Sequence, residues 1–135
     1  MGLFKKKKKE KKPVNNTIQI STLELIKIIR LADEAIDDSQ IEYDLPFKSG
    51  ETSHVIGIDY NRDLAPKNGL HREYISYYLD DQIFISIEDL CQNAELDGYR
   101  IMEYPEKITI DSVFKEVLES GDIESHEGMT WYGYY

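Results

Sequence analysis

The chain has 135 residues and a formal net charge of −10 at pH 7, and 41% of its residues are hydrophobic. This length fits one domain, and this apolar content excludes a chain that is disordered throughout. The single Cys91 excludes an intrachain disulfide and argues against a disulfide-stabilised secreted scaffold. We therefore expect one cytoplasmic domain over residues 17–135.

The charge is divided between two parts of the chain. Residues 5–12 (KKKKKEKK) carry seven lysines and one glutamate, whereas the remaining residues carry 9 basic and 25 acidic side chains. An acidic body repels phosphate groups, so we do not expect the folded part to bind nucleic acid. Residues 1–16 are expected to be a disordered tail, because neighbouring lysines repel one another and Pro13 interrupts any helix.

This tail has two interpretations. It is either a solubilising segment, which we favour, or a membrane-surface contact in which two apolar residues enter the interface and each lysine adds about 1 kcal/mol on anionic lipid. The residues of the second interpretation are Leu3, Phe4, Lys5, Lys6, Lys7, Lys8 and Lys9. We expect no signal peptide and no membrane-spanning helix, because charges interrupt the longest apolar-rich stretch, residues 23–36.

The first structural element predicted after the tail is a core helix. Ser21 and Glu24 match a capping box, and apolar residues recur at helical spacing from Leu25 to Ile36. Two strands should follow. Residues 41–47 alternate between apolar and polar side chains, and Pro46 favours an edge position or a strand end; residues 53–60 continue the sheet, with Gly57 indicating a bulge or a close approach of another segment.

Residues 61–72 are expected to form the longest loop. The loop contains Arg62, Lys67 and Arg72 beside His71, which is unusual in so acidic a protein. These cations either neutralise neighbouring carboxylates, which we favour, or bind an anion such as phosphate.

Residues 74–90 (YISYYLDDQIFISIEDL) predict a hairpin that turns at Asp80-Asp81 and runs into a helix capped by Ser86. Asp89 is the expected return partner of that cap, and Ile85 with Leu90 the expected hydrophobic staple. Alternation places one apolar set on a face of the first strand and another on a face of the second: Ile75, Tyr77 and Leu79, then Ile83, Ile85 and Ile87.

The helix should extend to about Leu96 and end at Asp97-Gly98, followed by two short strands in residues 99–104 and 107–110. Thr109 or Asp111 is expected to cap a third helix that ends at Gly121. The predicted fold class is therefore α+β: a mainly antiparallel sheet of about five or six strands, with three helices packed largely on one face.

No catalytic or metal-binding motif is found in the sequence. The three histidines lie in separated segments, and Cys91 has no CxxC partner, so we expect no metal and no cofactor. Cys91 falls on the apolar side of the second helix, where we expect it in the core and not as a nucleophile. Adjacent carboxylates fall at turns and helix starts, which is typical of caps, and we do not expect an enzyme.

The C-terminal stretch combines acidic and aromatic side chains. It is either a final strand with its rings on the sheet, or a contact surface, because Trp and Tyr are frequent hot-spot residues and carboxylates select a cationic partner. The residues of this candidate partner-binding surface are Glu119, Asp122, Glu124, Glu127, Trp131, Tyr132, Tyr134 and Tyr135.

These features together predict a small acidic binding protein that sequesters or inhibits a basic protein partner. Toxin-neutralising immunity proteins of bacteria have a similar composition. Two alternatives stay open: a peripheral membrane adaptor that places its lysine tail on anionic lipid, and a small ligand-binding domain that uses the loop of residues 61–72. The sequence leaves the identity of the partner and the oligomeric state open.

Overall fold

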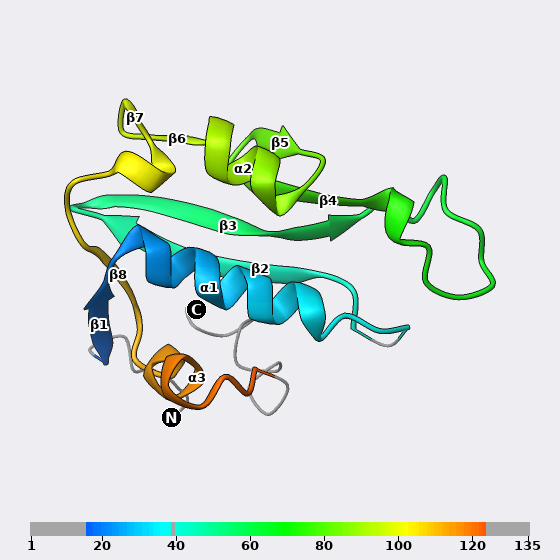
Figure 1. The fold of residues 1–135 in the computed structure, drawn as a ribbon, viewed down its shortest axis with the longest axis horizontal. Coiled ribbons are helices and arrows are strands. Elements are labelled where there is room, and N and C mark those ends of the chain that lie inside the picture. Colours follow the sequence, from blue (N-terminus) through cyan, green and yellow to red (C-terminus); the bar gives the residue numbers. More distant parts are fainter. Residues whose placement is uncertain (1–15, 39, 124–135) are drawn as a thin grey trace, which may run out of the picture.

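The structure, a computed structural model, describes residues 16–38 and 40–123. Its centre is a six-stranded antiparallel sheet in the order β1-β8-β2-β3-β4-β5, beside a two-stranded sheet of β6 and β7 (Figure 1). The strands are β1 (Thr17–Ile20), β2 (Tyr43–Ser49), β3 (Thr52–Tyr60), β4 (Ile75–Leu79), β5 (Gln82–Phe84), β6 (Glu95–Leu96), β7 (Tyr99–Arg100) and β8 (Ile108–Asp111). The helices are α1 (Thr22–Glu34), α2 (Ile87–Asn93) and α3 (Phe114–Ser120), with short 3-10 helices η2 (Arg72–Tyr74) and η3 (Ile101–Glu103).

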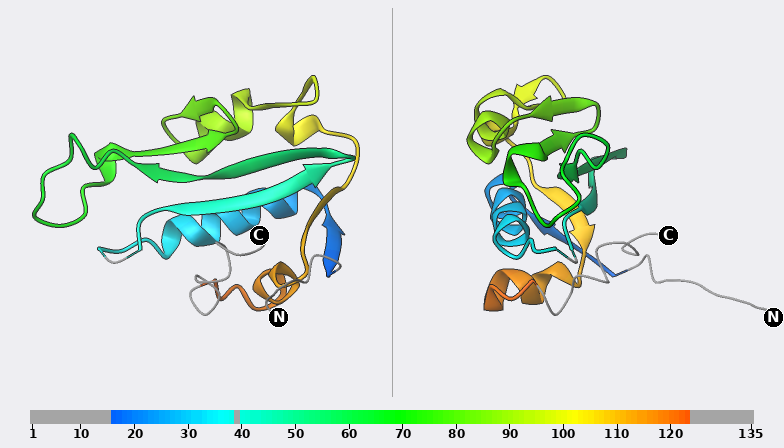
Figure 2. Two further views of the ribbon diagram at one scale, coloured as in Figure 1. Left: turned by 180° about the vertical axis from the view of Figure 1, so that it is seen from behind. Right: turned by 90° about the vertical axis from the view of Figure 1, so that its right-hand side faces the viewer.

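The three helices lie on one side of the sheet, as the turned view in Figure 2 shows. Side chains that alternate along each strand therefore meet different surroundings. On β2, Tyr43, Leu45 and Phe47 are buried beneath the helices, whereas Asp44 and Lys48 point to the opposite surface and are partly or fully exposed. The predicted α+β class, strand number and one-sided helix layer are confirmed.

Helix α1 forms as its sequence predicts. The Glu24 amide donates to Ser21 Oγ at 3.1 Å, and the Ser21 amide donates to Glu24 Oε1 at 2.9 Å, which completes the capping box. The apolar stripe is buried, with at most 1% of each residue exposed at Leu25, Ile28, Ile29 and Ala32. Burying each of these larger aliphatic side chains contributes about 1.5–3 kcal/mol, so this helix is a main source of stability.

The hairpin and capped helix of residues 74–90 are confirmed, with two corrections. Ser86 Oγ accepts from the Asp89 amide at 2.9 Å, as predicted. The Asp89 carboxylate, however, accepts from the Ile85 amide and not from the Ser86 amide. Ile83 and Ile85 are 73% and 84% exposed, so the predicted apolar face of the second strand and the staple are wrong. Phe84 takes the core position because it lies opposite the buried Tyr77 of β4, and its neighbours must then point away.

Helix α2 is shorter than predicted. It ends at Asn93, and Asp97-Gly98 is not a helix end but the turn between β6 and β7. Both turn residues have positive φ, 51° at Asp97 and 88° at Gly98, as a two-residue hairpin turn of the primed kind requires. The predicted long helix is therefore wrong in its last turn, because this Asp-Gly pair is a strong hairpin signal.

Three further elements differ from the predictions: η3, β1 and the start of α3. Residues 101–103 form η3 instead of a strand, and β1, which pairs with β8 from Thr17 to Ile20, was not predicted. Helix α3 begins after Val113 with no side-chain cap; Asp111 instead accepts from the Val113 amide at 2.9 Å. Its end at Gly121 is confirmed, with a left-handed φ of 76°.

Pro46 lies in an interior strand, contrary to the predicted edge position. The pairing explains why the sheet tolerates it. Val55, the partner of Pro46 on β3, donates its amide to Asp80 instead of to β2, and the register joins β2 to β8 only at Lys48 and Thr109. The strands β2 and β8 diverge beyond that point. Neither β3 nor β8 therefore needs a backbone N–H donor at position 46, which proline lacks.

Gly57 allows a close approach between three strands, as its sequence context indicated. Asp44 lies opposite Gly57, and Gly57 lies opposite Tyr78. A Cβ atom at Gly57 would overlap the backbone oxygen of Tyr43 and would lie 2.7 Å from the Tyr78 hydroxyl. Only glycine therefore lets the Tyr78 side chain pass across β3 and donate its hydroxyl proton to Asp44.

Candidate functional site

The described residues include only the first part of the predicted partner-binding surface. Glu119 lies on α3 and Asp122 follows the helix cap, and both are exposed. The other predicted contact residues, Glu124, Glu127, Trp131, Tyr132, Tyr134 and Tyr135, lie outside the described residues. So do the tail residues of the membrane interpretation, 3–9. In the described part of the chain, no helix is long and apolar enough to cross a membrane.

The cations of the loop at residues 61–72 contact groups of their own chain. Arg72 pairs with Asp33 at 2.8 Å, and Arg62 pairs with Glu42 at 3.5 Å. Lys67 donates to the backbone oxygen of Arg62. The two arginine pairs fit the favoured interpretation, in which the loop neutralises neighbouring carboxylates, whereas Lys67 bonds to the backbone.

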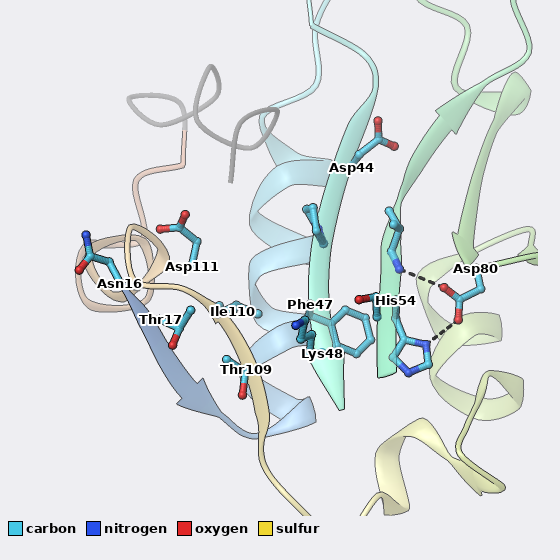
Figure 3. A pocket seen from close by; sticks show the side chains of 13 residues that line it. Asn16, Thr17, Asp44, Phe47, Lys48, His54, Asp80, Thr109, Ile110 and Asp111 are labelled. Carbon is cyan, nitrogen blue, oxygen red and sulfur yellow. Dashed lines mark hydrogen bonds and ion pairs between the residues drawn. The ribbon is translucent and has the colours of Figure 1, made fainter. Parts of the chain in front are cut away.

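The sheet surface opposite the helices, called the open face below, carries a hollow of about 1070 Å³. The hollow lies where β2 and β8 diverge, and Pro46, Val55 and Ile110 contribute apolar lining. Figure 3 shows its charged rim: Asp111 on the β8 side, and Asp44 and Asp80 toward the other strands. Its other charged or titratable lining residues are Lys48 and His54.

Carboxylates crowd the part of the open face around Tyr78. Burial raises the pKa of the Tyr78 phenol well above its ordinary value, and the hydrogen bond to Asp44 raises it further. The charges of Asp44, Asp59 and Glu42 act in the same direction. Asp44 also lines the hollow, so this group of carboxylates lies beside it.

Two tyrosines should ionise late in alkaline solution. Burial also raises the pKa of Tyr77, whose hydroxyl donates to Asp33 at 2.6 Å. A folded-state pKa above the unfolded value stabilises the fold at neutral pH, and this contribution is lost as the pH rises above about 10. We expect absorbance at 295 nm to show two of the ten tyrosines ionising only with unfolding.

The matched variants are Tyr77→Phe and Tyr78→Phe, combined in one chain. This double variant should lack the late-ionising fraction, and its free energy of unfolding should fall less steeply above about pH 10. Ionisation of every tyrosine at the ordinary pH in the folded wild type would contradict the prediction.

Four polar side chains from three hairpins form a second feature, called the hairpin cluster. Ser49 Oγ lies 2.8 Å from His54 Nε2, and His54 Nδ1 lies 2.7 Å from Asp80 Oδ2. Ser49 Oγ also donates to Asp97 Oδ2 at 2.6 Å. The His54 ring stacks on Phe47 with centroids 5.1 Å apart. The turns β2–β3, β4–β5 and β6–β7 are therefore joined at one end of the sheet.

In the hairpin cluster, Ser49, His54 and Asp80 lie in the sequence of contacts found in a Ser-His-Asp triad, but the Ser49 hydroxyl donates its proton to a fourth residue. A nucleophilic serine needs a histidine nitrogen that accepts its proton. Ser49 instead directs its proton to Asp97, and only 3% of Ser49 is exposed. We interpret the cluster as a structural link between hairpins.

The sequence contained no motif for this cluster, because its members come from three separate hairpins. The one available signal was local: Ser49 and Asp97 each precede a glycine, and Asp80 begins an Asp-Asp turn. Such residues are common in hairpin turns generally.

Replacing His54 by phenylalanine should destabilise the domain by about 2 kcal/mol. The new ring preserves the stack on Phe47 but removes the bonds to Ser49 and Asp80. His71→Phe is the matched control, because His71 bonds through its ring only to Asn68 within its own loop, and it should cost less than about 0.5 kcal/mol. Equal losses in urea denaturation would refute a special role for the cluster.

Cys91 is half-buried and packs against the edge of the core, so its expected full burial is corrected. Burial raises the pKa of the Cys91 thiol, which opposes formation of the reactive thiolate. Within residues 16–38 and 40–123, no group of three or more His, Cys, Asp or Glu side chains is placed to hold a metal ion.

Comparisons with known protein families, with curated proteins and with solved structures found no match.

Proposed function

We propose that this protein binds and sequesters or inhibits a basic protein partner, and that the open face forms part of the binding surface. The observation that carries this proposal is the hollow on the open face, which combines an apolar lining with a rim of aspartates. No helix or strand of the described chain covers this side of the sheet (Figure 2). We propose the acidic aromatic stretch from Glu119 as a second contact region, of which the described members, Glu119 and Asp122, are exposed.

Charge supports a cationic partner. The described residues contain 23 acidic and 9 basic side chains, and three of the arginines are engaged in ion pairs within the chain. A surface with this excess of negative charge speeds the approach of a positively charged partner, and salt reduces the effect. The apolar lining offers space for an anchoring side chain of the partner, where most binding energy is usually concentrated.

The test is a pull-down from the native cell, with the chain lacking residues 1–12 as bait and mass spectrometry as the readout. We expect one basic protein in stoichiometric amount, with an association rate that falls steeply as salt rises. Recovery of no protein partner, or of an acidic one, would refute the proposal.

The open face is tested with Asp44→Asn/Asp111→Asn, which retains hydrogen-bond acceptors for Tyr78 and for the Val113 amide. Its matched control is Glu34→Gln/Glu73→Gln, with the same change of charge at two exposed carboxylates outside the hollow. Binding should weaken at least about tenfold in the first variant and little in the second. Equal affinities would exclude the open face from the site.

The C-terminal contribution is tested separately by changing Trp131, Tyr132 and Tyr134 to alanine. We expect weaker binding with cooperative unfolding retained. Loss of cooperative unfolding would show instead that these rings belong to the core.

A further inference from the structure

The described chain begins at Asn16 beside the open face, four residues after the N-terminal lysine-rich segment of residues 5–12. Asn16 and Thr17 themselves line the hollow, on the side of β1 and β8 (Figure 3). Four peptide units separate Lys12 from Asn16, a reach of at most about 14 Å, and Lys5 can extend to about 40 Å. The lysines are thus tethered at the rim of the hollow.

The charges of the two parts are complementary. The lysine-rich segment carries seven lysines and one glutamate, whereas the rim of the hollow presents Asp44, Asp80 and Asp111 against the single Lys48. Asp59, which is exposed, adds a fourth carboxylate on the same face, on strand β3. Asp80 pairs with His54. Asp44, Asp59 and Asp111 accept hydrogen bonds but form no ion pair with another described residue, so their charges are available to a cation from outside the sheet.

We infer that the lysine-rich segment occupies the open face of its own chain. Exposed ion pairs are individually weak and are screened by salt, so the contact depends on several lysines acting together. The short tether offsets this weakness, because it holds the lysines at a high effective concentration beside the carboxylates.

One consequence rests on the proposed function. A basic partner that uses the open face must displace the lysine-rich segment, so this segment acts as a competitor built into the chain. The full chain should then bind the partner several-fold more weakly than the chain lacking residues 1–12. This difference should vanish in Asp44→Asn/Asp111→Asn.

The contact itself is tested on the full chain without any partner. A nitroxide is attached at Gly2→Cys in a Cys91→Ser background, and broadening of backbone amide signals is measured by NMR at low protein concentration. We expect strong broadening at open-face amides such as Val55 and Thr109, and much weaker broadening at the buried α1 stripe behind the sheet. High salt and Asp44→Asn/Asp111→Asn should abolish it, whereas Glu34→Gln/Glu73→Gln should not.

Several outcomes would overturn the inference. They are broadening that is strongest on the helix side, broadening that is uniform or insensitive to salt, absence of broadening, and broadening that disappears on dilution, which would indicate a second copy. Open-face signals that move on removal of residues 124–135 but not of residues 1–12 would assign the face to the C-terminal segment. The NMR experiment contains no partner, so a negative result in it would not contradict the proposed function. A negative pull-down would likewise not contradict the contact between the lysine-rich segment and the open face.

Discussion

Replacing Gly57 by alanine should destabilise the domain by about 3 kcal/mol or more. The added Cβ would overlap the backbone oxygen of Tyr43, and it would also lie 2.9 Å from Cζ of Tyr78. A side chain can rotate away, but a backbone oxygen in a paired strand moves only if β2 and β3 separate. Urea denaturation of the variant should show a lower midpoint with an unchanged slope.

Two controls separate the overlap from the loss of a glycine. Gly50→Ala tests a glycine with φ of 58° and no atom within 4 Å of a new Cβ, so only about 1 kcal/mol of left-handed strain is expected. Gly57→Ala/Tyr78→Ala removes the ring but not the Tyr43 oxygen, and should stay strongly destabilised. A loss below about 0.5 kcal/mol in Gly57→Ala would show that the strands are not this close.

Replacing Ile29 by aspartate should unfold the domain at 25 °C. Ile29 is 1% exposed and lies on the buried stripe of α1, where a carboxylate would lose its water without gaining a partner. The lost burial and this desolvation together approach the whole stability of a small domain, about 5–15 kcal/mol. Circular dichroism and the dispersion of NMR signals measure the outcome.

Leu23→Asp is the control on the same helix. Leu23 is 61% exposed in the first turn of α1, where a negative charge is favourable near the helix N-terminus. We expect its free energy of unfolding to stay within about 0.5 kcal/mol of the wild type. Comparable unfolding of both variants would mean that helix charge, and not burial at Ile29, decides the result.

Predictions succeeded where the determining contacts are local in the sequence. The capping box of Ser21 and Glu24 closes over three residues, and the turn at Asp80-Asp81 connects strands that are adjacent along the chain. Periodicity likewise identified the buried side of α1. Predictions failed where the packing of the sheet against the core decides which face of a strand is buried: Ile83 and Ile85 face solvent because Phe84 pairs with the buried Tyr77.

The candidate site was the least predictable part. The hairpin cluster joins Ser49 and Asp97, which are 48 positions apart, and the rim of the hollow joins Asp44 to Asp111. The aspartates were visible in the sequence only as members of an acidic composition. Their common position on one face depends on the order of the strands, which no local pattern specifies.

The amino-acid order alone established the contrast between a basic tail and an acidic body, the start of α1 and α2, and the alternation of most strands. These features depend on composition, on capping over three or four residues and on side-chain period. Strand order, the divergence of β2 from β8 and the identity of the uncovered face came only with the folded chain. They arise from pairing between distant segments, where the best packing of the whole core selects one register among many.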